Sequence, residues 1–113
     1  MNKYRNKKTE IILNDEIYKF DSKKEAQHFQ HLLSLLRAGV ISELKLQPEF
    51  EIIPQVKWNG KTLCKIKYIA DFQYKQNDME IVVDVKGLKT DVYNLKKRLF
   101  LIQYPQYKFV EIY

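Results

Sequence analysis

Along the first forty residues, the apolar positions change from an alternating pattern to a helical one. Two runs rich in Ile, Tyr and Phe, 9–13 and 16–20, flank an Asn-Asp pair that favours a turn, so we expect a β-hairpin. Ser22 and the glutamate three residues later then match a capping box. Apolar side chains follow at helical spacing until a glycine, which predicts a helix over 23–38.

Three strands are expected in the middle of the chain. The first covers 44–53 and ends at a proline. The second covers 62–75 and follows the pair Asn59-Gly60, which is a strong hairpin signal. The third covers 80–86, after a polar loop, and ends at a glycine.

A second helix and a last strand complete the pattern. Thr90 or Asp91 can cap this helix, and a proline after it ends it. One apolar face is predicted from side chains at i, i+3, i+7 and i+10, namely Val92, Leu95, Leu99 and Ile102. The final strand covers 108–113. The order of hairpin, helix, three strands, helix and strand predicts one α/β domain around a central sheet.

Length and composition narrow the class of protein. A chain of 113 residues, 45% hydrophobic and 13% aromatic, fits one folded domain better than a disordered segment. No apolar run approaches the roughly 20 residues that span a bilayer, and no apolar segment behind the basic N-terminus forms a secretory signal. A single cysteine, Cys64, makes neither an internal disulfide nor, alone, a zinc site. We therefore expect a cytoplasmic protein without a membrane partner.

The net charge of +6 is concentrated near the N-terminus. Residues 1–8 form a basic arm with no acid, whose cations are Lys3, Arg5, Lys7 and Lys8. Such an arm on a nearly neutral body favours a polyanionic partner, because phosphates attract Lys and Arg at long range. A solubilising terminus would carry the same charges, so charge alone leaves both interpretations open.

Two aspartates interrupt predicted strands that are otherwise apolar. Asp84 and Lys86 lie two positions apart in the third strand and share a face, while Asp71 lies in the second strand. A hairpin with a four-residue loop, 76–79, would place Asp71 directly opposite Asp84. Opposed carboxylates repel unless a cation such as Mg²⁺ bridges them. An ion pair with Lys86 is the alternative, and a slip of one residue would put the two aspartates on opposite faces.

These residues resemble the signature of a known nuclease group. Asp71, followed by Asp84-Val85-Lys86, resembles the motif of the PD-(D/E)XK nuclease superfamily, with Ala70 in place of the proline in its name. The resemblance extends to segments of small phage-encoded members, which here are Phe20–Ala26, Leu46–Phe50, Tyr68–Phe72 and Asp84–Gly87. More distantly, the chain is similar to archaeal Holliday-junction resolvases and to the endonuclease subunit of some transposases.

The resemblance also implies a fold. It implies a restriction-endonuclease-like core, α-β-β-β-α-β, in which helices flank a mixed central sheet. In this chain the core would follow the N-terminal β-hairpin, within a single nuclease-like domain over 9–113. The order of elements expected from the apolar pattern agrees with it.

Roles for individual residues follow from the same resemblance. It implies that Asp71, Asp84 and the backbone carbonyl of Val85 bind Mg²⁺, for which Mn²⁺ can substitute. Lys86 would hold or polarise the attacking water, or stabilise the phosphate as charge develops on it. Glu25 would complete the metal shell, although the third helical position in a capping box explains this glutamate without any catalysis.

A second group of residues is expected to hold DNA. Together with the basic arm, it comprises Gln47, Lys89, Thr90, Lys96 and Lys97. A solvated helix face explains the lysines equally well, and a strand glutamine is commonly only exposed. Trp58, beside the Asn59-Gly60 turn, could stack on a base or pack on its own hairpin.

The sequence therefore predicts a Mg²⁺-dependent DNA endonuclease that hydrolyses phosphodiester bonds. Phage recombination, replication or DNA processing is the setting implied by the resemblance, with branched DNA as a substrate by analogy and the host cytoplasm as the location. A homodimer is expected if two symmetric cuts are made. No organic cofactor is expected. The alternatives are a non-catalytic nucleic-acid-binding module on the same fold and a structural phage protein.

Overall fold

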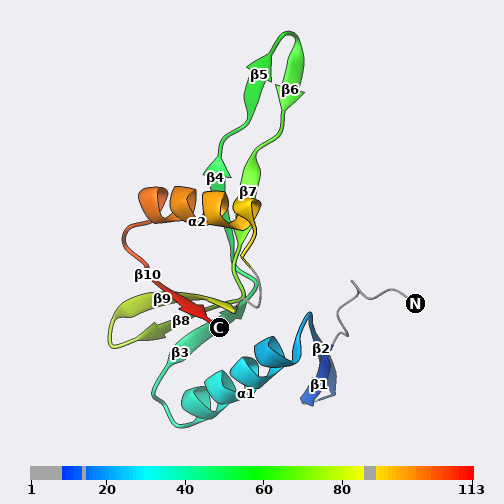
Figure 1. The fold of residues 1–113 in the computed structure, drawn as a ribbon. Helices are drawn as coiled ribbons and strands as arrows, with labels where there is room; N and C mark the ends of the chain where they lie inside the picture. The colour runs from blue at the N-terminus through cyan, green and yellow to red at the C-terminus, as the bar shows by residue number, and fades with distance from the viewer. Residues whose placement is uncertain (1–8, 14, 86–88) are drawn as a thin grey trace, which may run out of the picture. The chain divides into compact units, whose positions relative to one another are not determined.

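The computed structural model describes residues 9–13, 15–85 and 89–113 (Figure 1). The chain is a mixed α/β protein, and it divides into two compact units, of which the first ends at Ile41 and the second begins at Ser42. The elements are β1 (Thr9–Leu13), β2 (Glu16–Phe20), α1 (Lys23–Arg37), β3 (Ser42–Leu46), β4 (Glu49–Ile53), β5 (Val56–Trp58), β6 (Lys61–Leu63), β7 (Ile66–Ile69), β8 (Phe72–Gln76), β9 (Met79–Val85), α2 (Asp91–Gln103) and β10 (Lys108–Ile112).

The first unit confirms the predicted hairpin and helix. Strands β1 and β2 pair antiparallel, with Leu13 opposite Glu16. Helix α1 begins after Ser22, whose Oγ accepts a hydrogen bond of 3.1 Å from the backbone N–H of Glu25. The helix buries Phe29, whose ring centroid lies 5.0 Å from that of Phe20 in β2, so the hairpin packs on the helix through aromatic rings.

The second unit contains a mixed four-stranded sheet in the order β10-β9-β8-β3. Strand β8 pairs antiparallel with β9 and with β3, whereas β10 pairs parallel with β9. The predicted last strand is thus confirmed, with its end at Ile112. Strand β9 has neighbours on both sides and is buried from Ile81 to Val85, as a run that is apolar except for Asp84 predicts.

The turn between β8 and β9 is tighter than predicted. The four-residue loop 76–79 is wrong, because Gln76 and Met79 pair and only Asn77 and Asp78 form the turn. Both turn residues have positive φ, 51° and 65°, which suits the right-handed twist of the flanking strands.

Two of the predicted strands are interrupted. The continuous strand 44–53 is wrong, because β3 ends before Gln47, whose φ is +50°, and Pro48 offers no N–H to a ladder. The continuous strand 62–75 is wrong as well, since it divides into β6, β7 and β8. The paired strands therefore leave the four-stranded sheet as a ribbon, with β4 against β7.

The β4–β7 ribbon lies against α2 (Figure 1). A cluster of aromatic rings fills this contact. The ring of Phe100 in α2 lies 4.8 Å from Phe50 in β4 and 5.3 Å from Tyr68 in β7, measured between centroids. Tyr104 after the helix donates a hydrogen bond of 2.8 Å to the carbonyl of Glu51. Beyond this contact the ribbon continues as β5 and β6, joined by the predicted Asn59-Gly60 turn.

Helix α2 buries a different face from the predicted one. Thr90 is confirmed as the cap, because its Oγ1 accepts a hydrogen bond from the N–H of Tyr93 at 3.1 Å. The predicted apolar face is wrong for Val92, Leu95 and Ile102, which are 63%, 59% and 73% exposed. Its fourth member, Leu99, packs against the aromatic cluster beside the buried Tyr93 and Phe100. The two aromatic rings offer more area than aliphatic side chains, so the helix is rotated to bury them. No helix in the described parts of the chain has the length and apolar character needed to cross a membrane.

Replacing Phe100 by Ala should therefore destabilise the protein far more than replacing Ile102 by Ala. We expect a loss of about 3–5 kcal/mol in the free energy of unfolding for Phe100→Ala, since it opens a cavity inside the aromatic cluster. The exposed Ile102→Ala should change that free energy by about 0.5 kcal/mol or less. Urea denaturation followed by circular dichroism measures both, and equal losses would contradict the assigned face.

Candidate active site

Asp71 lies at the point where the chain bends out of the sheet. The ladder between β8 and β9 ends at Phe72 and Val83, so Asp71 and Asp84 occupy the next positions of the same register. The backbone N–H of Asp71 donates to the carbonyl of Val83 at 3.0 Å, and its own carbonyl accepts from Gln47 at 3.0 Å. The bend is therefore fixed from both sides, and the two aspartates lie on adjacent strands.

The Asp71 side chain takes the place of the strand that has bent away. Its Oδ2 accepts a hydrogen bond of 2.6 Å from the backbone N–H of Val85, near the end of β9. In an extended strand the N–H and C=O of one residue point toward the same edge. The carbonyl of Val85 thus faces the side on which the half-buried Asp71 carboxylate lies.

Asp84 is buried, with 1% of its surface exposed, and is held by a tyrosine. The hydroxyl of Tyr68 in β7 donates a hydrogen bond to Asp84 Oδ2. Burial, this hydrogen bond and the nearby charges of both Asp84 and Asp71 raise the pKa of Tyr68 far above its usual range. Tyr68 therefore stays protonated and donates to the carboxylate at any physiological pH.

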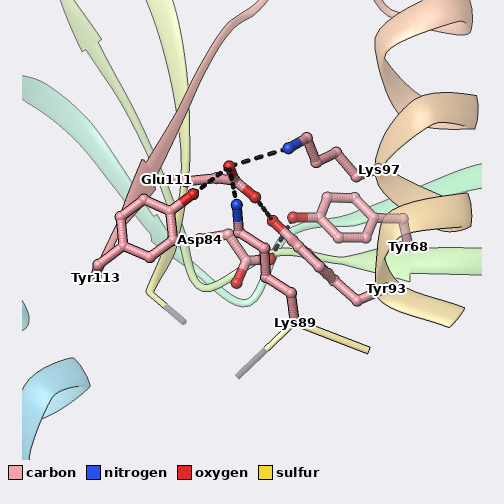
Figure 2. A network of polar contacts seen from close by, with 7 residues as sticks. All are labelled: Tyr68, Asp84, Lys89, Tyr93, Lys97, Glu111 and Tyr113. Carbon is pink, nitrogen blue, oxygen red and sulfur yellow. Dashed lines mark hydrogen bonds and ion pairs between the residues drawn. The ribbon is translucent and has the colours of Figure 1, made fainter. Parts of the chain in front are cut away.

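Glu111 is a third carboxylate, beside Asp84 (Figure 2). It lies opposite Asp84 in the parallel ladder between β9 and β10, so the two side chains share a face of the sheet. Its Oε2 accepts a hydrogen bond of 2.6 Å from the hydroxyl of Tyr93 in α2. Its Oε1 lies 3.0 Å from Nζ of Lys97 and 3.5 Å from Nζ of Lys89.

The partners of Glu111 keep it ionised. Burial alone would raise its pKa, but hydrogen bonds from Tyr93, Lys97 and Tyr113 outweigh that effect and lower the pKa to about 2. Burial and the bond to Glu111 in turn raise the pKa of Tyr93. The Tyr68 hydroxyl is close enough to that of Tyr93 to affect the pKa of Tyr93, so the Asp84 and Glu111 clusters adjoin.

A pocket of about 250 Å³ opens beside this cluster. It lies between β7 and the first turns of α2, and its lining residues are Lys67, Tyr68, Ile69, Thr90, Val92, Tyr93 and Lys96. Two lysines and the capped start of a helix line it, and a helix start favours anions. Because Tyr68 lines the pocket and also binds Asp84, the pocket and the acidic cluster share a wall.

The structure places some of the predicted DNA-binding residues around this cluster. Thr90 and Lys96 line the pocket, and Lys89 and Lys97 contact Glu111. Gln47 contacts Asp71 through its backbone, and its side chain is exposed.

Other predicted site residues are not brought to the cluster by the described contacts. Lys86 lies outside the described residues, as does the basic arm of Lys3, Arg5, Lys7 and Lys8. Glu25 belongs to the first unit, where its N–H bonds to the capping Ser22. The catalytic roles of Glu25 and Lys86 stay predictions.

Sequence reasoning missed Tyr68, Tyr93 and Glu111. The signal for Glu111 was available in part, because it is the only acid in the predicted last strand. Its pairing with Asp84 depends on the register of a parallel strand after a crossover helix, which local sequence does not determine. Tyr68 and Tyr93 come together only through the packing of α2 on β7.

The oxygen donors fit a small hard cation. Within 9–13, 15–85 and 89–113, no group of three or more His, Cys, Asp or Glu side chains could hold a metal ion. The candidate set has two such side chains, Asp71 and Asp84, with the Val85 carbonyl as a third oxygen. Mg²⁺ commonly binds through one or two carboxylates and keeps several waters, so this set suits it.

Comparison with known proteins gives a family. Residues 1–113 match the family described as "Protein of unknown function (DUF1064)". The chain belongs to the DUF1064 family. No curated protein matches the chain. The aspartates, tyrosines and Glu111 of this DUF1064 protein are thus assigned from their chemistry and geometry.

The low pKa of Glu111 predicts a pH-dependent contribution to stability in this DUF1064 protein. Because the folded pKa, about 2, is below the ordinary value of 4.5, the stabilisation is complete above that ordinary value. It is lost as the pH falls from about 5 toward 2. We expect Glu111→Gln to lose about 2 kcal/mol of unfolding free energy at pH 7, discounted because the lysines are partly in solvent.

Urea denaturation at a series of pH values measures this effect. The difference between wild type and Glu111→Gln should shrink as the pH approaches 2. The matched control is Glu43→Gln, which removes an exposed glutamate 3.7 Å from Lys75 and should stay within about 0.5 kcal/mol of wild type. A difference for Glu111→Gln that does not change between pH 7 and pH 2.5 would contradict the assignment.

Proposed function

We propose that this protein is a Mg²⁺-dependent DNA endonuclease of the PD-(D/E)XK type, which hydrolyses phosphodiester bonds. The observation that carries the proposal is the bend at Asp71. There the Asp71 carboxylate meets the backbone of Val85, next to the buried Asp84, at the positions where the resembled motif has its metal ligands. An ion pair between Lys86 and an aspartate would not by itself require the chain to leave the sheet at Asp71, just before β8.

The arrangement of elements supports the same proposal. Strands β4 to β7 form the ribbon that leaves the four-stranded sheet. Without this ribbon, the elements follow one another along the chain as α1, β3, β8, β9, α2 and β10. This order agrees with the α-β-β-β-α-β core that the resemblance implies. Strands β3, β8 and β9 pair antiparallel in this order, and β10 pairs parallel with β9, so the sheet is mixed.

The residues of the chain would share the chemistry as follows. Asp71, Asp84 and the Val85 carbonyl would hold the metal, and Tyr68 positions Asp84 by donating to one carboxylate oxygen. When bound, Mg²⁺ lowers the pKa of a water and stabilises negative charge on the phosphate. Lys86, the next residue along the chain, would hold the attacking water. The role of Glu25 in the metal shell stays a prediction from the resemblance.

The pocket next to Tyr68 supports a phosphodiester substrate. Its lysines and the start of α2 are suited to a backbone phosphate beside the one that is cut. Lys67 is already bound to Glu49 at 2.8 Å, so Lys96 is the cation we assign to that phosphate. A homodimer would supply two such sites for paired cuts, and phage DNA recombination, replication or processing is the setting we propose from the resemblance.

Cleavage of supercoiled plasmid and of a four-way junction tests the function. We expect wild type to cut with Mg²⁺ or Mn²⁺ and not with EDTA. Asp84→Asn and Lys86→Ala should each lose at least about 100-fold in rate, because one removes a metal ligand and the other the group that holds the water. The matched control is Asp78→Asn, which changes an exposed aspartate in the β8–β9 turn and should cut like wild type.

Circular dichroism should show that every variant is folded. Metal-dependent cutting that survives in both Asp84→Asn and Lys86→Ala would contradict the proposal. So would a wild type that binds DNA and cuts neither substrate with either metal. That second result would favour a non-catalytic nucleic-acid-binding module.

The pocket gives a separate prediction about substrate binding. Lys96→Ala should raise the KM for DNA and leave kcat nearly unchanged, because the lysine holds a phosphate that is not cut. The slope of log affinity against log salt should fall by about 0.9. Arg98→Ala removes an exposed cation of the same helix outside the pocket and serves as the control. Equal effects of both variants would mean that the pocket plays no special part.

A further inference from the structure

The hairpin of β5 and β6 extends beyond the packed part of the second unit (Figure 1). Every residue of both strands is exposed. Among the elements that the structure describes, β5 and β6 pack extensively only on each other. The aromatic cluster under α2 draws no residue from them. The hairpin is thus not needed to complete the core, and its side chains are available to a partner.

One face of the hairpin carries apolar side chains around a tryptophan. Val56 and Trp58 lie two apart in β5 and share a face, and Leu63 lies opposite Val56. Trp58 is 63% exposed, so packing on its own hairpin leaves most of the indole uncovered. Exposed apolar side chains gathered on one face are typical of a surface that binds a ligand or another macromolecule.

The charges of the hairpin indicate which kind of partner it binds. The stretch 56–67 contains lysines and no acid. At the base of the ribbon, Lys65 and Lys67 are paired with Glu51 and Glu49, at 3.9 and 2.8 Å. Nearer the turn, Lys57 and Lys61 have no ion pair among the residues that the structure describes. Lys61 lies opposite Trp58 and shares its face, whereas Lys57 lies on the other face of the ribbon. Positive charge therefore stands on both faces beside Trp58, which favours a polyanion over an apolar protein surface.

We propose that the β5–β6 hairpin is a second DNA contact, in which Trp58 stacks on a base while Lys57 and Lys61 bind the phosphates around it. A two-stranded ribbon fits a groove of DNA, and base–aromatic stacking tolerates any sequence. In continuous duplex both faces of each base are covered, and exposing one costs energy. The hairpin therefore selects DNA with unpaired or unstacked bases, such as bubbles and junctions. This inference rests on the proposed function, whose substrate it narrows.

The tryptophan itself reports on the contact, because Trp58 is the only tryptophan in the chain. Intrinsic fluorescence should be quenched when the wild-type protein is saturated with an oligonucleotide that contains a bubble, in EDTA so that nothing is cut. Fluorescence anisotropy of the labelled bubble and of a matched full duplex then gives the affinities. We expect Trp58→Ala to bind the bubble about 5- to 100-fold more weakly, with a smaller loss on the duplex.

Two further variants separate stacking from charge. Trp58→Phe should retain most of the affinity, because a smaller aromatic ring still stacks. The double variant Lys57→Ala/Lys61→Ala should reduce the salt slope by about 1.8 on both DNAs. Its matched control is Lys45→Ala/Lys108→Ala, which removes two exposed lysines of β3 and β10 and should leave the slope nearly as in wild type.

The inference is overturned if saturating bubble DNA leaves the fluorescence unchanged, or if Trp58→Ala binds it as tightly as wild type. It is also overturned if Trp58→Ala abolishes self-association in light scattering and leaves DNA affinity intact, since the face then binds protein. Quenching in a protein that never cuts DNA would support the DNA contact of the hairpin and contradict the proposed endonuclease activity. Metal-dependent cutting without quenching would do the reverse.

Discussion

The hydrogen bond from the Val85 N–H to the Asp71 carboxylate is the constraint on which the second unit depends. A buried backbone N–H needs a partner, and the strand that would supply one to Val85 has bent away. The carboxylate takes that place, so the side chain that we propose as a metal ligand also completes the sheet. The same bend sends β7 and β4 across to α2, where they form the aromatic cluster. The bend at Asp71 therefore both places the two aspartates and brings β4 and β7 to the aromatic core.

Three carboxylates, those of Asp71, Asp84 and Glu111, gather beside β9, and their charges are balanced in two different ways. Glu111 is surrounded by two tyrosine hydroxyls and two lysines, and these donors stabilise its ionised form. Asp84 is far more buried and accepts a hydrogen bond from the Tyr68 hydroxyl, while Asp71 accepts one from the Val85 N–H. Glu111 already has two lysines as partners, whereas Asp71 and Asp84 stand at the positions where the resembled motif has its metal ligands. This difference is why we assign the metal to Asp71 and Asp84 and a supporting role to Glu111.

Much of the fold follows from local sequence. The N-terminal hairpin, the helix capped by Ser22, the Asn59-Gly60 turn and the cap at Thr90 all depend on residues within a few positions of one another. Their chemistry is readable because capping and turn preferences act locally. The pairing that brings Asp71 next to Asp84 was also predicted, although the turn that creates it is tighter than expected.

What the sequence did not predict depends on contacts between distant elements. Gln47 breaks the strand through its positive φ. Two hydrogen bonds hold the break, from the Gln47 N–H to the Asp71 carbonyl and from the Ala70 N–H to the Pro48 carbonyl. Each bond joins residues more than twenty positions apart in the sequence. The buried face of α2 was decided by the rings already present in β4 and β7. Glu111 joined the site through a parallel strand whose register only the tertiary fold sets. Local rules do not contain this information.

The most direct test of the account is a calorimetric titration of the protein with Mn²⁺, without DNA. We expect wild type to bind one divalent ion per chain, and Asp71→Asn and Asp84→Asn each to weaken this binding by at least about tenfold. The turn variant Asp78→Asn should bind as wild type does. Undiminished binding in both aspartate variants, or no binding by the folded wild type, would contradict the assignment of these two carboxylates as a metal site.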